Sequence, residues 1–169
     1  LFSLPDLSNS KRLLRIYCSH NKLVSLNGIQ DCTELEEIKA EFNLITNADV
    51  FQKLNKLRFI ELKKNLINKI PEIQNQTQLF ILDLSFNNIS KIEGLKSLIN
   101  LTDLSLFNNE IEEVNNLDYN TKLNILSVGN NKIKDVKKMV DYLKKFPNLQ
   151  GLTVSGNVFN KDAESGGIN

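Results

Sequence analysis

The side chains that most often carry enzyme chemistry are scarce in this chain. Its 169 residues include one histidine, His20, and two cysteines, Cys18 and Cys32. A histidine can serve as general base to a neighbouring nucleophile, but no cysteine is directly beside His20, which lies where a strand is expected to end. We therefore interpret His20 as a solvated or hydrogen-bonded histidine at the edge of a sheet, and not as a catalytic base.

Motifs that cradle phosphates or present a nucleophile are also missing. The chain contains no G-x-x-x-x-G-K-[ST], no G-x-G-x-x-G and no G-x-S-x-G. Two cysteines are too few for a disulfide framework and have no metal-ligand spacing. Each stands where an apolar residue is expected, so we interpret both as buried small hydrophobic residues. We expect no catalytic, cofactor-binding or metal-binding residues, no small-molecule substrate and no enzyme activity.

A repeat of 22 residues positions all other features. It has the pattern L-x-x-L-x-L-x-x-N, the signature of a leucine-rich repeat with one strand and one return segment per turn. Residues 1–12 are the return half of a partial turn. Full turns begin at Leu13, Leu35, Leu57, Leu79, Leu101 and Leu123, and the last partial turn begins at Leu149. We predict one leucine-rich-repeat domain over 1–169. Because solenoids need polar terminal caps, we expect it to be part of a longer protein.

The positions within a turn predict the fold class. The fourth and sixth residues, such as Leu82 and Leu84, point inward from a strand, and stacked turns make these strands parallel. The ninth residue is Asn in all seven turns, and a carboxamide can satisfy backbone donors and acceptors where the chain leaves the strand. These residues are Asn21, Asn43, Asn65, Asn87, Asn109, Asn131 and Asn157. We interpret them as structural rather than as a ligand ladder. The prediction is an α/β fold: a right-handed solenoid with about seven parallel strands on its concave face.

One return differs from the others, which are expected to be 3₁₀ or irregular. Five apolar residues in it have helical spacing: Val136, Met139, Val140, Leu143 and Phe146. Pro147 then ends the segment. We predict a helix over 136–146, with its lysines (Lys137, Lys138, Lys144 and Lys145) on a solvated face instead of in a phosphate site.

Net charge and hydropathy narrow the classes of partner. The chain has 21 basic and 20 acidic residues and a formal net charge of +1, which gives no bulk attraction to nucleic acid or to an anionic membrane. No apolar run approaches the roughly 18 residues of a membrane span. The first residues do not have the pattern of a signal peptide. With few cysteines, these observations favour a reducing compartment such as the cytoplasm.

The outward side of the strands is the expected binding surface. Five of the nine phenylalanines lie at its variable positions: Phe42, Phe59, Phe80, Phe86 and Phe107. We expect exposed aromatic side chains grouped on one face to bind a protein; the alternative is that they fold over the strand edges and are partly buried. The predicted partner-binding residues on the concave face are Tyr17, Lys39, Phe59, Glu61, Ile81, Asp83 and Phe107.

The short 22-residue turns resemble the leucine-rich-repeat subclass typified by a regulatory subunit of protein phosphatase 1. From about residue 35 to residue 159, the chain is more closely similar to the leucine-rich-repeat subunit of the nexin–dynein regulatory complex of cilia and flagella. The resemblance rests on residues 41–70, on ILDLSFNNISKIEGLKSLINLTDLSLFNNEI (81–111), on LNILSVGNNKI (123–133) and on YLKKF (142–146). It departs at Val158, where the terminal cap of that family usually has Pro.

This resemblance implies a non-catalytic scaffold of the ciliary or flagellar axoneme that binds axonemal or dynein-associated proteins. It implies a location in the cytoplasm and its cytoskeleton. Two alternatives remain open at this point: a regulatory subunit of protein phosphatase 1, and a binding repeat protein displayed on a microbial surface.

Overall fold

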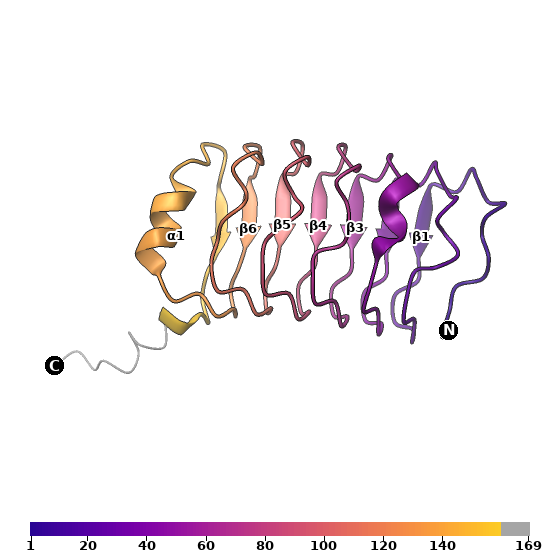
Figure 1. Ribbon diagram of the computed structural model, residues 1–169, viewed down its shortest axis with the longest axis horizontal. Coiled ribbons are helices and arrows are strands. Elements are labelled where there is room, and N and C mark those ends of the chain that lie inside the picture. The colour runs from indigo at the N-terminus through magenta and orange to yellow at the C-terminus, as the bar shows by residue number, and fades with distance from the viewer. Residues whose placement is uncertain (160–169) are drawn as a thin grey trace.

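The computed structural model describes residues 1–159, which form a solenoid with one strand in each turn (Figure 1). Seven strands make one parallel sheet in sequence order: β1 (Arg15–Tyr17), β2 (Glu37–Lys39), β3 (Phe59–Glu61), β4 (Ile81–Asp83), β5 (Asp103–Ser105), β6 (Ile125–Ser127) and β7 (Gly151–Thr153). The predicted leucine-rich-repeat solenoid with its parallel sheet is confirmed.

Register in the sheet follows the repeat. Each residue pairs with the one at the same position of the next turn, as Ile38 does with Ile60 and Ile60 with Leu82. The middle residue of a strand points inward and its two neighbours point outward, because side chains alternate along a strand. Ile38, Ile60 and Leu82 are therefore fully buried, and the residues on either side of each are available for binding.

Apolar side chains from the strands and the returns fill the space between them. The returns contribute columns of apolar side chains to this core. One such column is Ile45, Ile67 and Ile89, which are all essentially inaccessible to solvent. Cys18 and Cys32 are buried and unpaired, as predicted. Burial raises the pKa of the Cys18 thiol to about 11, so this sulfur is a protonated core group at neutral pH.

The asparagine column is structural, as the sequence predicts. Asn87 is representative: its Nδ2 donates to the carbonyls of Leu62, Leu84 and Ser85, and its Oδ1 accepts from the amide of Ile67. The asparagines of the next turns make the same contacts with their own neighbours. Each carboxamide thus joins two successive turns through backbone groups that are closed to water.

The residue just before the buried asparagine turns the chain out of the strand. It has a left-handed backbone in every full turn, with φ of 58° at His20, 54° at Phe42, 54° at Lys64 and 55° at Phe86. Its amide donates to the next turn: Phe42 N to Lys63 O at 3.0 Å and Phe86 N to Phe107 O at 2.8 Å. The stack of turns therefore holds this conformation, which L-residues adopt at a cost of about 1–2 kcal/mol.

Two returns contain regular helix. A 3₁₀ helix, η1 (Asp49–Lys53), buries Phe51. The sixth return forms the α-helix α1 (Val136–Leu143), with Asp135 as its N-cap accepting from Lys138 N. This helix is three residues shorter than predicted, because the α conformation is disfavoured before a proline and Phe146, which remains buried, precedes Pro147.

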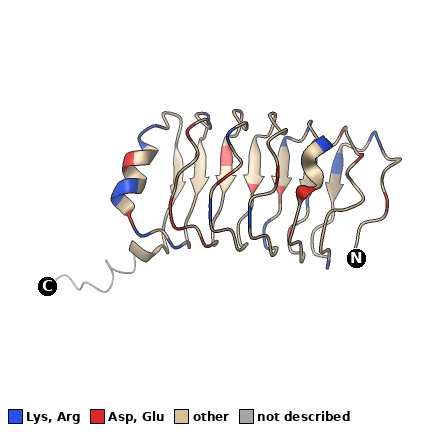
Figure 2. Cartoon of the chain, in the orientation of Figure 1, with Lys and Arg blue, Asp and Glu red and all other residues tan. Residues whose placement is uncertain are grey.

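Only part of the predicted apolar stripe of α1 faces the core. Met139 and Leu143 are buried, whereas Val136 and Val140 are exposed. Lysines of this return pair with carboxylates at its surface: Lys138 with Glu113 and Lys145 with Asp118. Figure 2 shows both basic and acidic residues on α1 and on the returns, as expected for a solvated face.

Candidate protein-binding face

We use the name sheet face for the outward side chains of β1–β7 and the residues that directly follow them. Register brings four predicted residues, Tyr17, Lys39, Glu61 and Asp83, into one column at the third strand position. The neighbouring column at the first position holds the predicted Phe59 and Ile81. Phe107 lies beyond the end of β5, at the edge of the face. The predicted residues therefore share one surface; that they bind a partner remains a prediction.

A chain of ion pairs crosses the first three strands. Lys39 Nζ lies 3.5 Å from Glu37 Oε1 and 3.2 Å from Glu61 Oε1, and Arg15 Nε lies 3.4 Å from Glu37 Oε2. Tyr17 Oη donates to Glu37 at 2.9 Å. Exposed pairs of this kind contribute little to stability, typically about 0–1 kcal/mol. Their consequence is that charged and aromatic groups are held in a defined pattern before any partner arrives.

The same contacts shift the protonation equilibria on this face. Hydrogen bonding to Glu61 raises the pKa of Lys39, and hydrogen bonding to Glu37 raises the pKa of Tyr17. Burial raises the pKa of Glu61, an effect that the nearby Lys39 opposes and Glu41 reinforces. Partly desolvated charges of this kind discriminate strongly between partners of opposite sign.

The last three strands carry no charged side chain at the third position. Their third-position residues are Ser105, Ser127 and Thr153. Ile125 is exposed beside Gly151, the smallest residue of its column. Most of the groups able to recognise a partner thus lie over the first four strands.

Aromatic residues of the face are less exposed than the sequence suggests. Only Phe42 of the five is exposed, and the other four are half-buried. The Phe107 ring covers Gly129, where an added Cβ would meet it at 2.9 Å, and the Arg58 guanidinium lies over Phe59. The expectation of exposed rings is therefore corrected in favour of its alternative, because small residues and long cations in neighbouring turns let the rings lie against the sheet edge.

Two lysines that sequence reasoning did not single out also belong to this region. Lys63 and Lys64 follow β3, and both ammonium groups lie over the ring of Phe86. The signal of Lys64 in the sequence is the spacing of 22 residues that links it to His20, Phe42 and Phe86.

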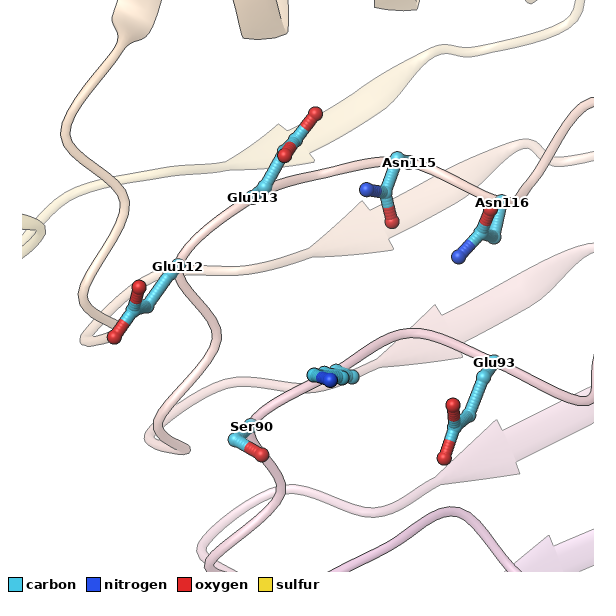
Figure 3. Close-up of a pocket in the computed structure, with 7 residues that line it drawn as sticks. Ser90, Glu93, Glu112, Glu113, Asn115 and Asn116 are labelled. Carbon is cyan, nitrogen blue, oxygen red and sulfur yellow. The ribbon is translucent and has the colours of Figure 1, made fainter.

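The return side carries a separate hollow, drawn in Figure 3. It lies between the fourth and fifth full turns, and Glu93, Glu112 and Glu113 line it together with Lys91. Among residues 1–159, no three His, Cys, Asp or Glu side chains are grouped so that they could hold a metal ion. In the same part of the chain, no helix is long and apolar enough to cross a membrane. The hollow is thus a surface feature without evident chemistry.

Comparison with known proteins agrees with this fold. A family model described as leucine-rich repeats (two copies) matches residues 77–119, whereas no curated protein matches the chain significantly. Internalin InlF of Listeria monocytogenes is 28% identical with a TM-score of 0.85 over 92% of this chain, which spans only 45% of that protein.

Two further solved structures, at lower identity, show the fold alone. Internalin C2 of the same bacterium is 24% identical with a TM-score of 0.79, covering 90% of this chain and 74% of its own. A leucine-rich-repeat protein of Leptospira interrogans is 22% identical with a TM-score of 0.74, covering 93% and 47%. Leucine-rich-repeat proteins are typically non-catalytic scaffolds that bind other proteins, and this chain has their repeats and their architecture.

Proposed function

We propose that this leucine-rich-repeat solenoid is a non-catalytic protein-binding scaffold and that its partner binds the sheet face of the second to fifth full turns. The observation that carries the proposal is the register of β2–β4, which sets Lys39, Glu61 and Asp83 in one column beside Phe59 and Ile81. Charged groups orient a partner, and aromatic and aliphatic groups anchor it.

The dimensions of the face suit such a partner. Seven strands about 4.8 Å apart span roughly 29 Å, enough for a helix or the edge of a small domain. The side chains are held by the repeat and by ion pairs such as Lys39–Glu61, so little conformational entropy remains to be lost on binding.

Replacing Phe59 or Phe107 with alanine should weaken partner binding by at least ~1 kcal/mol if that ring is an anchor, because its contacts with the partner are then lost. The partner is captured from a lysate of the source cells, identified by mass spectrometry, and its affinity for each variant is measured by calorimetry. Lys53→Ala, on the return side, is the control and should bind normally. Normal binding by both phenylalanine variants would overturn the assignment of the face.

For the cellular setting, we propose the axoneme of a cilium or flagellum, with axonemal or dynein-associated proteins as partners. The support is the resemblance of residues 41–70 and 81–111 to the leucine-rich-repeat subunit of the nexin–dynein regulatory complex. The test is fractionation of detergent-extracted cells: the protein should stay with axonemes, and its appearance in the soluble or membrane fraction would contradict this setting.

A second candidate setting is display on a microbial surface; its support is that InlF, a repeat protein of similar fold and 28% identity, comes from a bacterium, Listeria monocytogenes. A reagent that labels only exposed surface amines on intact cells would modify a displayed protein and leave an axonemal one unlabelled. A third, regulation of protein phosphatase 1, rests only on the length of the repeat; co-purification of the catalytic subunit would support it.

A further inference from the structure

A ladder of aromatic and cationic side chains follows the edge of the sheet face. We call it the rim column: His20, Phe42, Lys64 and Phe86, the residues other than glycine that have a left-handed backbone in the first four full turns. A left-handed backbone is uncommon for residues other than glycine and is an outlier for a bulky one such as phenylalanine. The stack of turns holds this conformation at the same position of every full turn, so these four side chains follow one another along the edge.

Contacts along the rim column are continuous. The rings of His20 and Phe42 stack with centroids 4.3 Å apart and planes 15° apart. Lys64 Nζ lies 4.6 Å from the centre of the Phe42 ring and 5.2 Å from that of Phe86. Lys63 Nζ lies 5.4 Å from the Phe86 ring, and Phe86 packs against Phe107 at 5.5 Å. Neighbouring turns thus set the Lys64 ammonium between the rings of Phe42 and Phe86, and the Lys63 ammonium over the Phe86 ring as well.

The two lysines are free to meet an anion. Among residues 1–159, no carboxylate forms a salt bridge with Lys63 or Lys64, whereas Lys39, on the adjacent strand β2, is paired with Glu37 and Glu61. Cations that rest on aromatic faces remain open to a carboxylate on their other side. The rim column therefore offers positive charge that this part of the chain does not neutralise.

Apolar surface lies directly beside these cations. Phe42 is 39% exposed, Leu44 is 44% exposed and Leu66 is 46% exposed. The two leucines are in register one turn apart, since Leu44 N donates to Leu23 O and Leu66 N donates to Ile45 O. A cluster of exposed apolar side chains bordered by unpaired cations is typical of a binding surface.

We propose that the rim column, with Lys63, Leu44 and Leu66, is the docking surface for an acidic segment of the partner protein that carries Leu or Phe anchors. This inference rests on the proposed scaffold function and specifies the chemistry of the partner. Its carboxylates pair with Lys63 and Lys64, and its apolar side chains cover Phe42 and the two leucines. The adjoining sheet face carries Glu41, Glu61 and Asp83, so a longer polyanion such as a nucleic acid is repelled there.

The test is a titration of the isotopically labelled chain followed by amide chemical shifts. One synthetic peptide alternates Glu with Leu and Phe, a second has Ser in place of Leu and Phe, a third has Lys in place of Glu, and oligothymidylate is the fourth ligand. Only the first should bind, with shifts at residues 20–22, 42–44, 63–66 and 86. K63E/K64E should weaken this binding by about tenfold or more, since charge reversal turns attraction into repulsion. Added salt should weaken it in the wild type.

The matched control is K134E/K137E, which changes the net charge equally but far from the rim column. It should bind the first peptide as the wild type does. The inference is overturned if both double variants weaken binding equally, or if the serine peptide binds as well as the first peptide. It is also overturned if the shifts are confined to β2–β4, if oligothymidylate binds more tightly than the first peptide, or if nothing binds. If Phe59→Ala loses binding of the natural partner and K63E/K64E keeps it, this inference is wrong, whereas the sheet-face proposal still stands.

Discussion

Replacing Asn87 with alanine should lower the free energy of unfolding by about 2–4 kcal/mol, since a buried polar group left without a partner costs roughly 1–3 kcal/mol and each further hydrogen bond lost costs about 0.5–1.5 kcal/mol. The change removes the acceptor for the amide of Ile67 and one of the two asparagine donors to each of the carbonyls of Leu62 and Leu84, which still accept from Asn65 and Asn109. These backbone groups lie between turns, where water cannot replace the carboxamide. Urea denaturation followed by circular dichroism measures the loss.

Asn21→Ala is the matched control for this prediction. Asn21 has the same position in the first full turn, but it is only half-buried, and its Oδ1 accepts from the amino group of Leu1. Water can reach these groups, so the change should cost only about 1 kcal/mol. Equal losses for the two variants would contradict the view that burial between turns gives the asparagine column its energetic weight.

Replacing Leu82 with alanine should cost about 2–5 kcal/mol through the cavity left in the core. Leu82 is fully buried and is in register with Ile60 on one side and Leu104 on the other. The rigid stack of strands limits how far the neighbouring turns can collapse into the space. The same denaturation experiment gives the change in free energy.

The adjacent residue provides the comparison for this second prediction. Ile81→Ala removes a similar aliphatic side chain, but one that points outward and is half-buried, so it should cost less than about 1.5 kcal/mol. A larger loss for Ile81→Ala than for Leu82→Ala would contradict the assignment of inward and outward positions in β4.

Both large effects are expected in the fourth full turn, and its place in the array matters. In a solenoid each turn contacts only its neighbours, so stability is close to a sum of local and nearest-neighbour contributions. A defect at Asn87 or Leu82 weakens the contacts with the turns before and after it. A defect at Asn21 affects mainly the first turns.

The sheet face and the rim column present two kinds of chemistry on adjoining surfaces. Carboxylates such as Glu61 and Asp83 lie over the middle strands, whereas Lys63 and Lys64 follow the edge. A partner could carry an acidic segment with apolar anchors against the rim column and basic groups against the carboxylates over the strands. Such a partner would bind in one orientation only, because the reversed orientation would set like charges against each other.

The amino-acid sequence by itself determined the repeat, the strand positions, the parallel register and the role of the asparagines. The physical reason is that this information is local and repeated: inward leucines at fixed spacing, with a carboxamide after each strand, specify every turn in the same way. The same local reasoning placed the helix near α1. It missed the helix end by three residues because it weighted the apolar Phe146 above the effect of Pro147.

Which outward side chains are exposed, paired or stacked follows from the tertiary contacts between turns. Residues 22 apart in the chain become neighbours, and the outcome depends on which way each side chain turns. Phe107 lies flat because Gly129 leaves room for it, Lys39 bridges two glutamates from different strands, and Lys64 rests between two rings. The repeat pattern does not predict these contacts, because packing constrains the residue types at the inward positions and leaves those at the outward positions free to vary.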